Sequence, residues 1–216
     1  MKVLLVNGSP HKNGCTNRAL EEVAKTLNAE NIDTEIFWIG AKVSGCMACF
    51  KCIDSGKCVL NDAVNDFRQK AYTADGFIFG SPTHYGGVAG NLVGFMDRLF
   101  FSEFQGNQNK AFYLKPAAAV VAARRAGSTG VFEQLLKYFT VQEMPVISTR
   151  YWNNVFGMDA EEVEQDGEGL YNMRVLGKNM AYFLKCKEAA QKLNVPLPKF
   201  EPPVFTNFVR RENGSR

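Results

Sequence analysis

The sequence contains no hydrophobic run that approaches the ~20 residues needed to cross a bilayer, and it has no low-complexity tract, internal repeat or recognisable linker. Its N-terminus enters an apolar run directly, without the charged region, apolar core and cleavage site of a secretory signal. The formal net charge is only +3, and Lys and Arg are scattered rather than gathered in one stripe. These absences argue against a membrane, secreted or nucleic-acid-binding protein, and we expect a cytoplasmic one.

The residues that are present suit one α/β domain. The chain has 216 residues, of which 46% are hydrophobic and 22% charged, and this length buries a sizeable core but would be cramped for two domains. Apolar, β-rich runs alternate with segments whose apolar residues recur at helical spacing. The predicted strands are 3–6, 34–38, 76–79, 117–122 and 145–148, and the predicted helices are 16–27, 62–72, 88–100, 131–139 and 170–193.

Nearly continuous apolar strands favour a five-stranded parallel sheet that is covered on both faces. Right-handed crossovers then give a doubly wound three-layer sandwich, whose ligands bind at the carboxyl ends of the strands. We expect the domain to span residues 1–194. The remaining tail, 195–216, holds Pro196, Pro198, Pro202 and Pro203, and we expect it to lie extended over the surface or over a partner subunit.

The segment GSPHKNGCTN, residues 8–17, connects the first predicted strand to the first predicted helix. Backbone amides and the positive end of the helix dipole make such a loop an anion site, and Ser9, Thr16 and Asn17 add side-chain donors. The segment lacks both G-x-G-x-x-G and a Gly-Lys-Ser/Thr ending. A monophosphate therefore fits better than a dinucleotide or a nucleoside triphosphate. The alternative is an ordinary strand-to-helix turn capped near Asn13 or Thr16.

Two further loops also follow apolar strands. GSPTHYGG, residues 80–87, offers the flat or amphipathic side chains of Pro82, His84 and Tyr85 beside glycines, which suits a planar ring. AARRAGSTG, residues 122–130, places two arginines before a predicted helix, and of these we favour Arg125 for contact with an anion or ring edge. Because strand ends cluster in this fold, we expect all these loops to share one pocket.

Together with NLVGFMDRL, residues 91–99, these loops resemble the flavodoxin-like superfamily, in particular its NADPH-dependent FMN reductase branch. The resemblance runs from Lys2 to about Leu193. It implies that the first loop holds the phosphate of FMN, that the second lies along the flavin ring and that NAD(P)H is the reductant. The residues predicted to bind FMN, from this resemblance and from the loops themselves, are Ser9, His11, Asn13, Gly14, Cys15, Thr16, Asn17, Pro82, Thr83, His84, Tyr85, Gly86, Arg125 and Gly127. No catalytic acid or base is expected, because the flavin carries the chemistry.

Four of the six cysteines form a C-x2-C-x2-C-x5-C pattern, with Cys46, Cys49, Cys52 and Cys58 inside the segment 44–60. Disulfides are improbable in a cytoplasmic chain, and the tight spacing would strain most pairings. Thiolates at such intervals can surround an iron–sulfur cluster. Zinc is the main competitor, although zinc ribbons separate their two cysteine pairs by a longer interval. A cysteine-rich loop that binds nothing is the third alternative.

This segment resembles the compact cysteine motif of the iron–sulfur flavoproteins, a subgroup of the same superfamily. The resemblance implies a 4Fe-4S cluster on these four cysteines and a homodimer or homotetramer in which the cluster approaches an FMN, commonly that of a neighbouring subunit. We therefore expect an FMN-binding NAD(P)H-dependent oxidoreductase that moves electrons through FMN and a cluster. The alternatives are an electron carrier, a plain FMN or quinone reductase without a cluster, a zinc-stabilised binding module and a flavin-free regulatory protein.

Residues 151–166 are interpreted as an insertion after the fifth predicted strand. Its aromatic residues, Trp152 and Phe156, are candidates for covering the flavin of a partner subunit or for a dimer contact. Its acidic residues are interpreted as solvated.

Overall fold

The computed structural model describes residues 1–199, 201, 204 and 206. The expectations for Pro202 and Pro203 lie outside the described residues. The strands are β1 (Lys2–Asn7), β2 (Asp33–Trp38), β3 (Gly76–His84), β4 (Gly87–Val88), β5 (Ala117–Ala123) and β6 (Asn154–Phe156). The helices are α1 (Cys15–Ala29), α2 (Lys51–Ser55), α3 (Ala63–Ala71), α4 (Gly90–Asn107), α5 (Ser128–Val141), α6 (Ala160–Gln165) and α7 (Gly167–Lys192).

Five strands pair in parallel in the order β2-β1-β3-β5-β6, and β4 forms an antiparallel hairpin with the end of β3. The chain starts at an inner strand, β1, adds β2 on one side and then β3, β5 and β6 on the other, so the carboxyl ends of β1, β3 and β5 are neighbours. The predicted doubly wound sheet of five parallel strands is confirmed.

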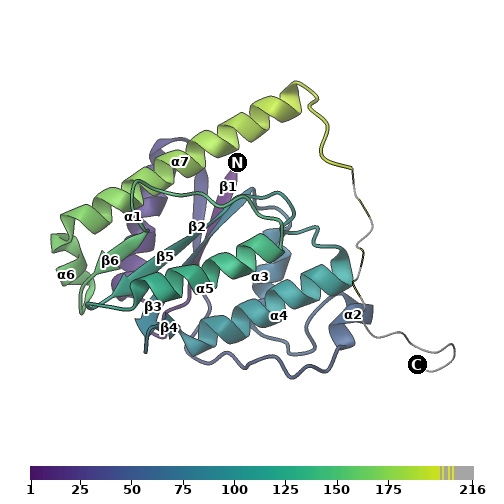
Figure 1. Cartoon of the computed structure of the whole chain (residues 1–216), viewed down its shortest axis with the longest axis horizontal. Coiled ribbons are helices and arrows are strands. Elements are labelled where there is room, and N and C mark those ends of the chain that lie inside the picture. The colour runs from purple at the N-terminus through teal and green to yellow at the C-terminus, as the bar shows by residue number, and fades with distance from the viewer. Residues whose placement is uncertain (200, 202–203, 205, 207–216) are drawn as a thin grey trace, which may run out of the picture.

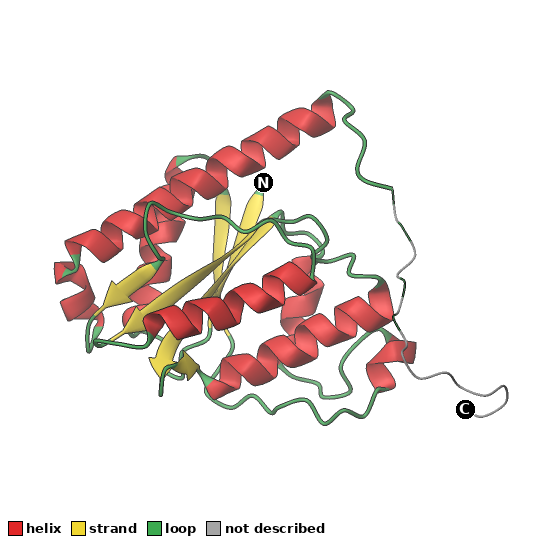
Figure 2. Cartoon of the chain, viewed as in Figure 1, coloured by secondary structure: helices red, strands yellow, loops and turns green. Residues whose placement is uncertain are grey.

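Helices cover both faces of the sheet (Figures 1 and 2), and the core consists of two apolar layers, one on each face. Alternate residues of a strand point to opposite faces. Leu4 and Val6 therefore pack toward α3, α4 and α5, whereas Val3 and Leu5 pack toward α1 and α7. A charged side chain does not suit either layer, which explains why the strands read as nearly continuous apolar runs.

The predicted fifth strand is wrong in its position. Residues 145–148 make a single parallel bridge, between Val146 and Ala117, and the ladder on this edge resumes at β6, where Asn154 is the partner of Val121. Eight residues on the edge thus match four on β5, so the chain loops out between the two contacts. The segment 151–166 is accordingly not an insertion after the sheet, because it contains β6 and α6.

A membrane span requires a helix of sufficient length and hydropathy. Within the part of the chain that the structure describes, no helix is both long enough and apolar enough to cross a bilayer.

Candidate functional site

The three strand-end loops meet around a cavity of about 400 Å³, here called the strand-end cavity. Its volume lies within the ~300–1,000 Å³ range of small-molecule sites. Nine of the residues assigned to FMN from the sequence line it, and they are Ser9, His11, Asn13, Gly14, Cys15, Thr16, Pro82, Thr83 and His84. The C-terminal end of β5 with Arg124, and residues 157–160 between β6 and the start of α6, form the rest of the lining.

The first loop is held in place by its own polar groups. The buried amide side chain of Asn7 accepts a hydrogen bond from the Ser9 backbone and donates to the Lys12 carbonyl, at 3.0 and 2.9 Å. Trp38 Nε1 donates to the Ser9 carbonyl from β2, at 2.9 Å. The loop is therefore pre-formed, which lowers the entropy cost of ordering it around a ligand.

The N-terminus of α1 faces the strand-end cavity and carries hydrogen-bond donors that are not used within the helix. Gly14 caps the helix without a side-chain hydrogen bond, and the first bond to its carbonyl comes from the Arg18 amide. Among the described residues, no hydrogen-bond partner is found for the amides of Cys15, Thr16 and Asn17 or for the buried hydroxyl of Thr16. These free donors at the positive end of a helix fit the phosphate of FMN.

Close packing of backbone joins the first loop to the second. The Gly8 amide donates to the Gly80 carbonyl at 2.9 Å, and a Cβ on Gly8 would lie 2.5 Å from Leu92 Cδ2 and 2.8 Å from the Gly80 oxygen. Only glycine permits this approach. The junction fixes the spacing between the loop that fits a phosphate and the loop that fits a ring.

The second loop is the tip of the β3–β4 hairpin. Tyr85 and Gly86 form its two-residue turn, with φ values of 50° and 75°, and a positive φ at both positions is what a type I′ turn requires. Tyr85 is fully exposed and does not line the strand-end cavity, whereas Pro82, Thr83 and His84 do. The end of β3 therefore lines the cavity, whereas the turn residues Tyr85 and Gly86 do not.

The third loop contributes Arg124. Its neighbour Arg125, favoured from the sequence, does not line the strand-end cavity, and neither does Gly127. Gly127 has a φ of 87°, and a Cβ there would lie 2.9 Å from Gly86 Cα, so this glycine packs the third loop against the second. Asn17 also lies outside the lining; its side chain accepts from Asn7 at 3.2 Å and donates to Glu21 at 2.6 Å.

The segment from Gly157 to Ala160 also lines the strand-end cavity. It was not among the residues predicted from the sequence, because the edge strand before it was misplaced. Cys15 Sγ donates to the Gly157 carbonyl at 3.4 Å. Burial raises the pKa of the Cys15 thiol, and the charges of Asp159 and Glu162 raise it further, so this sulfur stays protonated at neutral pH. Arg124 lines the same cavity as Asp159.

The four cysteines of the segment 44–60 line one second cavity, of about 20 Å³, here called the cysteine cavity. Cys46 and Cys49 are exposed, and Cys52 and Cys58 are half-buried. Burial raises the pKa of the Cys52 thiol, and the nearby Cys58, Cys49 and Cys46 raise it further. Among the described residues, no three His, Cys, Asp or Glu side chains are drawn together tightly enough to hold a single metal ion.

The backbone of the cysteine segment is strained. Ala48 and Phe50 have positive φ values of 49° and 57°, a conformation that costs a non-glycine residue of order ~1 kcal/mol and persists only where surrounding contacts enforce it. One such contact is the edge-on packing of Phe50 on Phe101 of α4, with ring centroids 6.1 Å apart. A four-thiol donor set on a constrained loop suits a soft metal or an iron–sulfur cluster.

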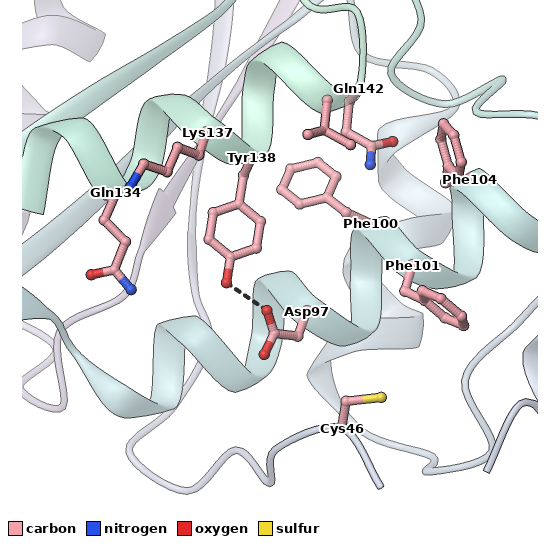
Figure 3. A pocket seen from close by; sticks show the side chains of 10 residues that line it. Cys46, Asp97, Phe100, Phe101, Phe104, Gln134, Lys137, Tyr138 and Gln142 are labelled. Atoms are coloured by element: carbon pink, nitrogen blue, oxygen red, sulfur yellow. Dashed lines mark hydrogen bonds between the residues drawn. The ribbon is translucent and has the colours of Figure 1, made fainter. Parts of the chain in front are cut away.

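A larger hollow, of about 660 Å³, lies between α4 and α5 (Figure 3). Phe100, Phe101 and Phe104 line it from α4, and Tyr138 spans it by donating to Asp97 at 2.5 Å. Burial, together with that bond to Asp97, raises the pKa of Tyr138. The hollow is mainly apolar and lies away from the strand ends, but Cys46 forms part of its rim. Its chemistry suits a protein surface rather than a phosphorylated cofactor.

The chain is similar in sequence to known proteins. A family model described as NADPH-dependent FMN reductase matches residues 1–159. An iron-sulfur flavoprotein of Methanocaldococcus jannaschii is 32% identical over 193 residues, which are 86% of this chain and 98% of that protein.

Solved structures share the fold at low identity. RosB, solved with 8-demethyl-8-formylriboflavin-5'-phosphate, superposes with a TM-score of 0.66 at 14% identity, over 100% of this chain and 96% of that one. An archaeal flavodoxin superposes with a TM-score of 0.57 at 17% identity, over 86% of this chain and 99% of the flavodoxin. The expected flavodoxin-like fold is thereby confirmed.

Proposed function

The chain belongs to the NADPH-dependent FMN reductase family, and on that premise we propose that it is an NAD(P)H-dependent oxidoreductase that binds FMN in the strand-end cavity. The observation that carries the proposal is the meeting of three strand-end loops around about 400 Å³, beside unpaired donors of α1. Bound FMN supplies hydride acceptance and one-electron transfer.

The roles of the chain's own residues follow from their positions. The amides of the first turn of α1, with Thr16, bind the phosphate, and the end of β3, from Pro82 to His84, orients the ring. Arg124 offers a cation to the negatively charged groups of the cofactor. The hairpin tip at Tyr85 leaves the cavity mouth open to solvent, so a nicotinamide can approach. No side chain is required as an acid or base.

The experiment is a titration of flavin-free protein with FMN, followed by the fluorescence of Trp38, whose indole is bonded to the first loop. Trp152→Phe removes the other tryptophan and serves as the background. We expect quenching that saturates at one FMN per chain, and NAD(P)H oxidation by the loaded protein with a quinone or free flavin as acceptor. Absence of FMN binding in the folded chain would contradict the proposal.

We further propose that Cys46, Cys49, Cys52 and Cys58 hold a 4Fe-4S cluster that exchanges electrons with FMN. The support is the common cavity of the four thiols and the likeness to an iron-sulfur flavoprotein. A cavity of about 20 Å³ holds little more than one water molecule. Cluster binding therefore requires the exposed Cys46 and Cys49 to move outward, and metal binding and loop ordering are coupled.

Iron and acid-labile sulfide, measured after anaerobic reconstitution, test this second proposal. Cys49→Ser should lose both, because it removes one of the four thiols. Cys186→Ser is the matched control, since Cys186 is exposed on α7, outside the cysteine cavity. Zinc in place of iron, or equal iron in the two variants, would contradict the cluster.

Self-association is a third part of the proposal. The strand-end cavity and the cysteine cavity share no lining residue, and the apolar hollow between α4 and α5 borders Cys46. A second copy packed on that hollow would cover the rim at Cys46, and the resemblance to iron–sulfur flavoproteins implies that the FMN of a neighbouring subunit approaches this cysteine segment. Sedimentation should give a dimer or tetramer that Val141→Glu weakens, since Val141 lies exposed in the hollow. A monomer at micromolar concentration would contradict it.

A further inference from the structure

One face of α4 contacts the cysteine segment, residues 44–60, and the residues just before and after it. Asn91 donates to the Gly40 carbonyl at 3.0 Å, a Cβ on Gly94 would lie 2.9 Å from the Ser44 carbonyl oxygen, and Phe101 packs on Phe50. Positions 91, 94, 98 and 101 share a face of a helix. The remaining residue of that face, Arg98, is therefore aimed at the cysteine segment.

Arg98 uses all of its donors on this segment and on Asp62, two residues beyond its end. Its guanidinium donates twice to the Asp62 carboxylate, at 2.8 Å each, and to the carbonyls of Ser44 and Leu60, at 3.3 and 3.4 Å. The fifth donor, Nε, lies 3.2 Å from Cys58 Sγ. An arginine has five N–H donors, and this one is only 3% exposed. It thus ties together both ends of the segment while pointing one N–H at a thiol.

We propose that Arg98 is a positioning residue for the cluster: it fixes Cys58 and raises the reduction potential through its N–H bond to that sulfur. This inference rests on the proposed cluster. Reduction transfers one electron from reduced flavin to the cluster and adds one negative charge to the iron–sulfur unit, without forming or breaking a bond. A hydrogen bond to a ligand sulfur stabilises that added charge, and the guanidinium remains protonated in both states.

The test compares Arg98→Gln and Arg98→Lys with matched changes at Arg68. Arg68 is also a buried arginine paired with a carboxylate, here Glu103 at 2.5 Å, but it contacts no cysteine. At a fixed solution potential, the ratio of oxidised to reduced cluster should be about tenfold higher in Arg98→Gln than in the wild type. This ratio corresponds to a reduction potential lower by about 59 mV for a one-electron couple. Arg98→Lys should fall in between, because lysine keeps the charge but cannot bind Asp62 and Cys58 together. Arg68→Gln should match the wild type.

A metal-free measurement separates this inference from the proposed function. In apo-protein, trypsin cleavage after Lys51 and Lys57, measured relative to cleavage after Lys137 of α5 in the same chain, should be about tenfold faster in Arg98→Gln than in Arg68→Gln. Only Arg98→Gln releases the segment, whereas loss of the Arg68–Glu103 pair destabilises the whole chain and raises cleavage at both sites. A wild-type chain that holds no cluster would refute the cluster part of the proposed function. A cluster-bearing Arg98→Gln with the wild-type potential would instead refute the role of Arg98. If Arg98→Gln does not fold, equal potentials in Arg98→Lys and Arg68→Lys would overturn it.

Discussion

Replacing Thr16 by valine should strengthen the fold and weaken FMN binding. The Thr16 hydroxyl is buried at the first turn of α1 and has no hydrogen-bond partner in the part of the chain that the structure describes. An unpaired buried polar group costs about 1–3 kcal/mol. Valine is nearly isosteric and removes that cost, so flavin-free Thr16→Val should gain stability of that order. A hydrogen bond to a charged group contributes about 1.5–3 kcal/mol, so its loss should weaken FMN binding by about 10- to 150-fold.

Urea unfolding of the flavin-free protein and FMN titration of the same preparation give the two numbers. Thr26→Val is the matched control, because Thr26 lies on the same helix but donates to the Glu22 carbonyl at 2.9 Å, away from the cavity. It should bring no gain in stability and no change in affinity. If Thr16→Val lowered stability and left FMN affinity unchanged, the assignment of α1 to the phosphate would be refuted.

Two further predictions concern the scaffold around α3 and α4. Glu103 is fully buried and accepts hydrogen bonds from Arg68 at 2.5 Å and from Tyr72 at 2.8 Å. Glu103→Gln leaves the buried cation of Arg68 without its counter-charge and should lower the free energy of unfolding in urea by about 3–5 kcal/mol. A decrease below about 1 kcal/mol would contradict the account of this pair. Burial, and then the charge of Lys187, lowers the pKa of Lys115 to about 8. Between pH values of about 8 and 10.5 the unfolded chain binds more protons than the folded chain, so the free energy of unfolding should rise with pH. Lys115→Met should flatten this rise. Equal slopes of unfolding free energy against pH in the wild type and in Lys115→Met would refute the prediction.

The sequence predicted the architecture well because its signals were local. Apolar strands followed at once by glycine-rich loops located β1, β3 and β5 and the loops that meet at their ends. The weak point was the edge of the sheet. β6 has only three residues and begins with the buried Asn154, so it lacks the apolar run that identifies an inner strand, and the run at 145–148 was chosen in its place.

The choice between Arg124 and Arg125 shows a second limit. The two arginines are adjacent in a loop, and no periodicity decides which of them turns toward the strand-end cavity. Asp159 was missed because it follows the misplaced strand, although an Asp three residues before Glu162 is a recognisable helix cap, and its carboxylate does accept from the Glu162 amide at 2.8 Å.

Arg98 was present in the segment NLVGFMDRL without being singled out. A lone arginine within a helix that otherwise reads as apolar is a signal that could have identified it, because such a charge needs a buried partner. What the sequence could not supply was the partner, since Asp62 and Cys58 lie some forty positions earlier in the chain. Contacts at that separation depend on the packing of α4 against the cysteine segment.

The most direct test of the account is an anaerobic preparation of the wild-type chain in which FMN, iron and acid-labile sulfide are assayed on one sample alongside its absorption spectrum. The account predicts flavin bands with a broad iron–sulfur absorption, one FMN per chain, and about four irons and four sulfides per chain. A colourless protein that takes up no added FMN would contradict its central claim, and flavin bands without iron after reconstitution would contradict the cluster alone.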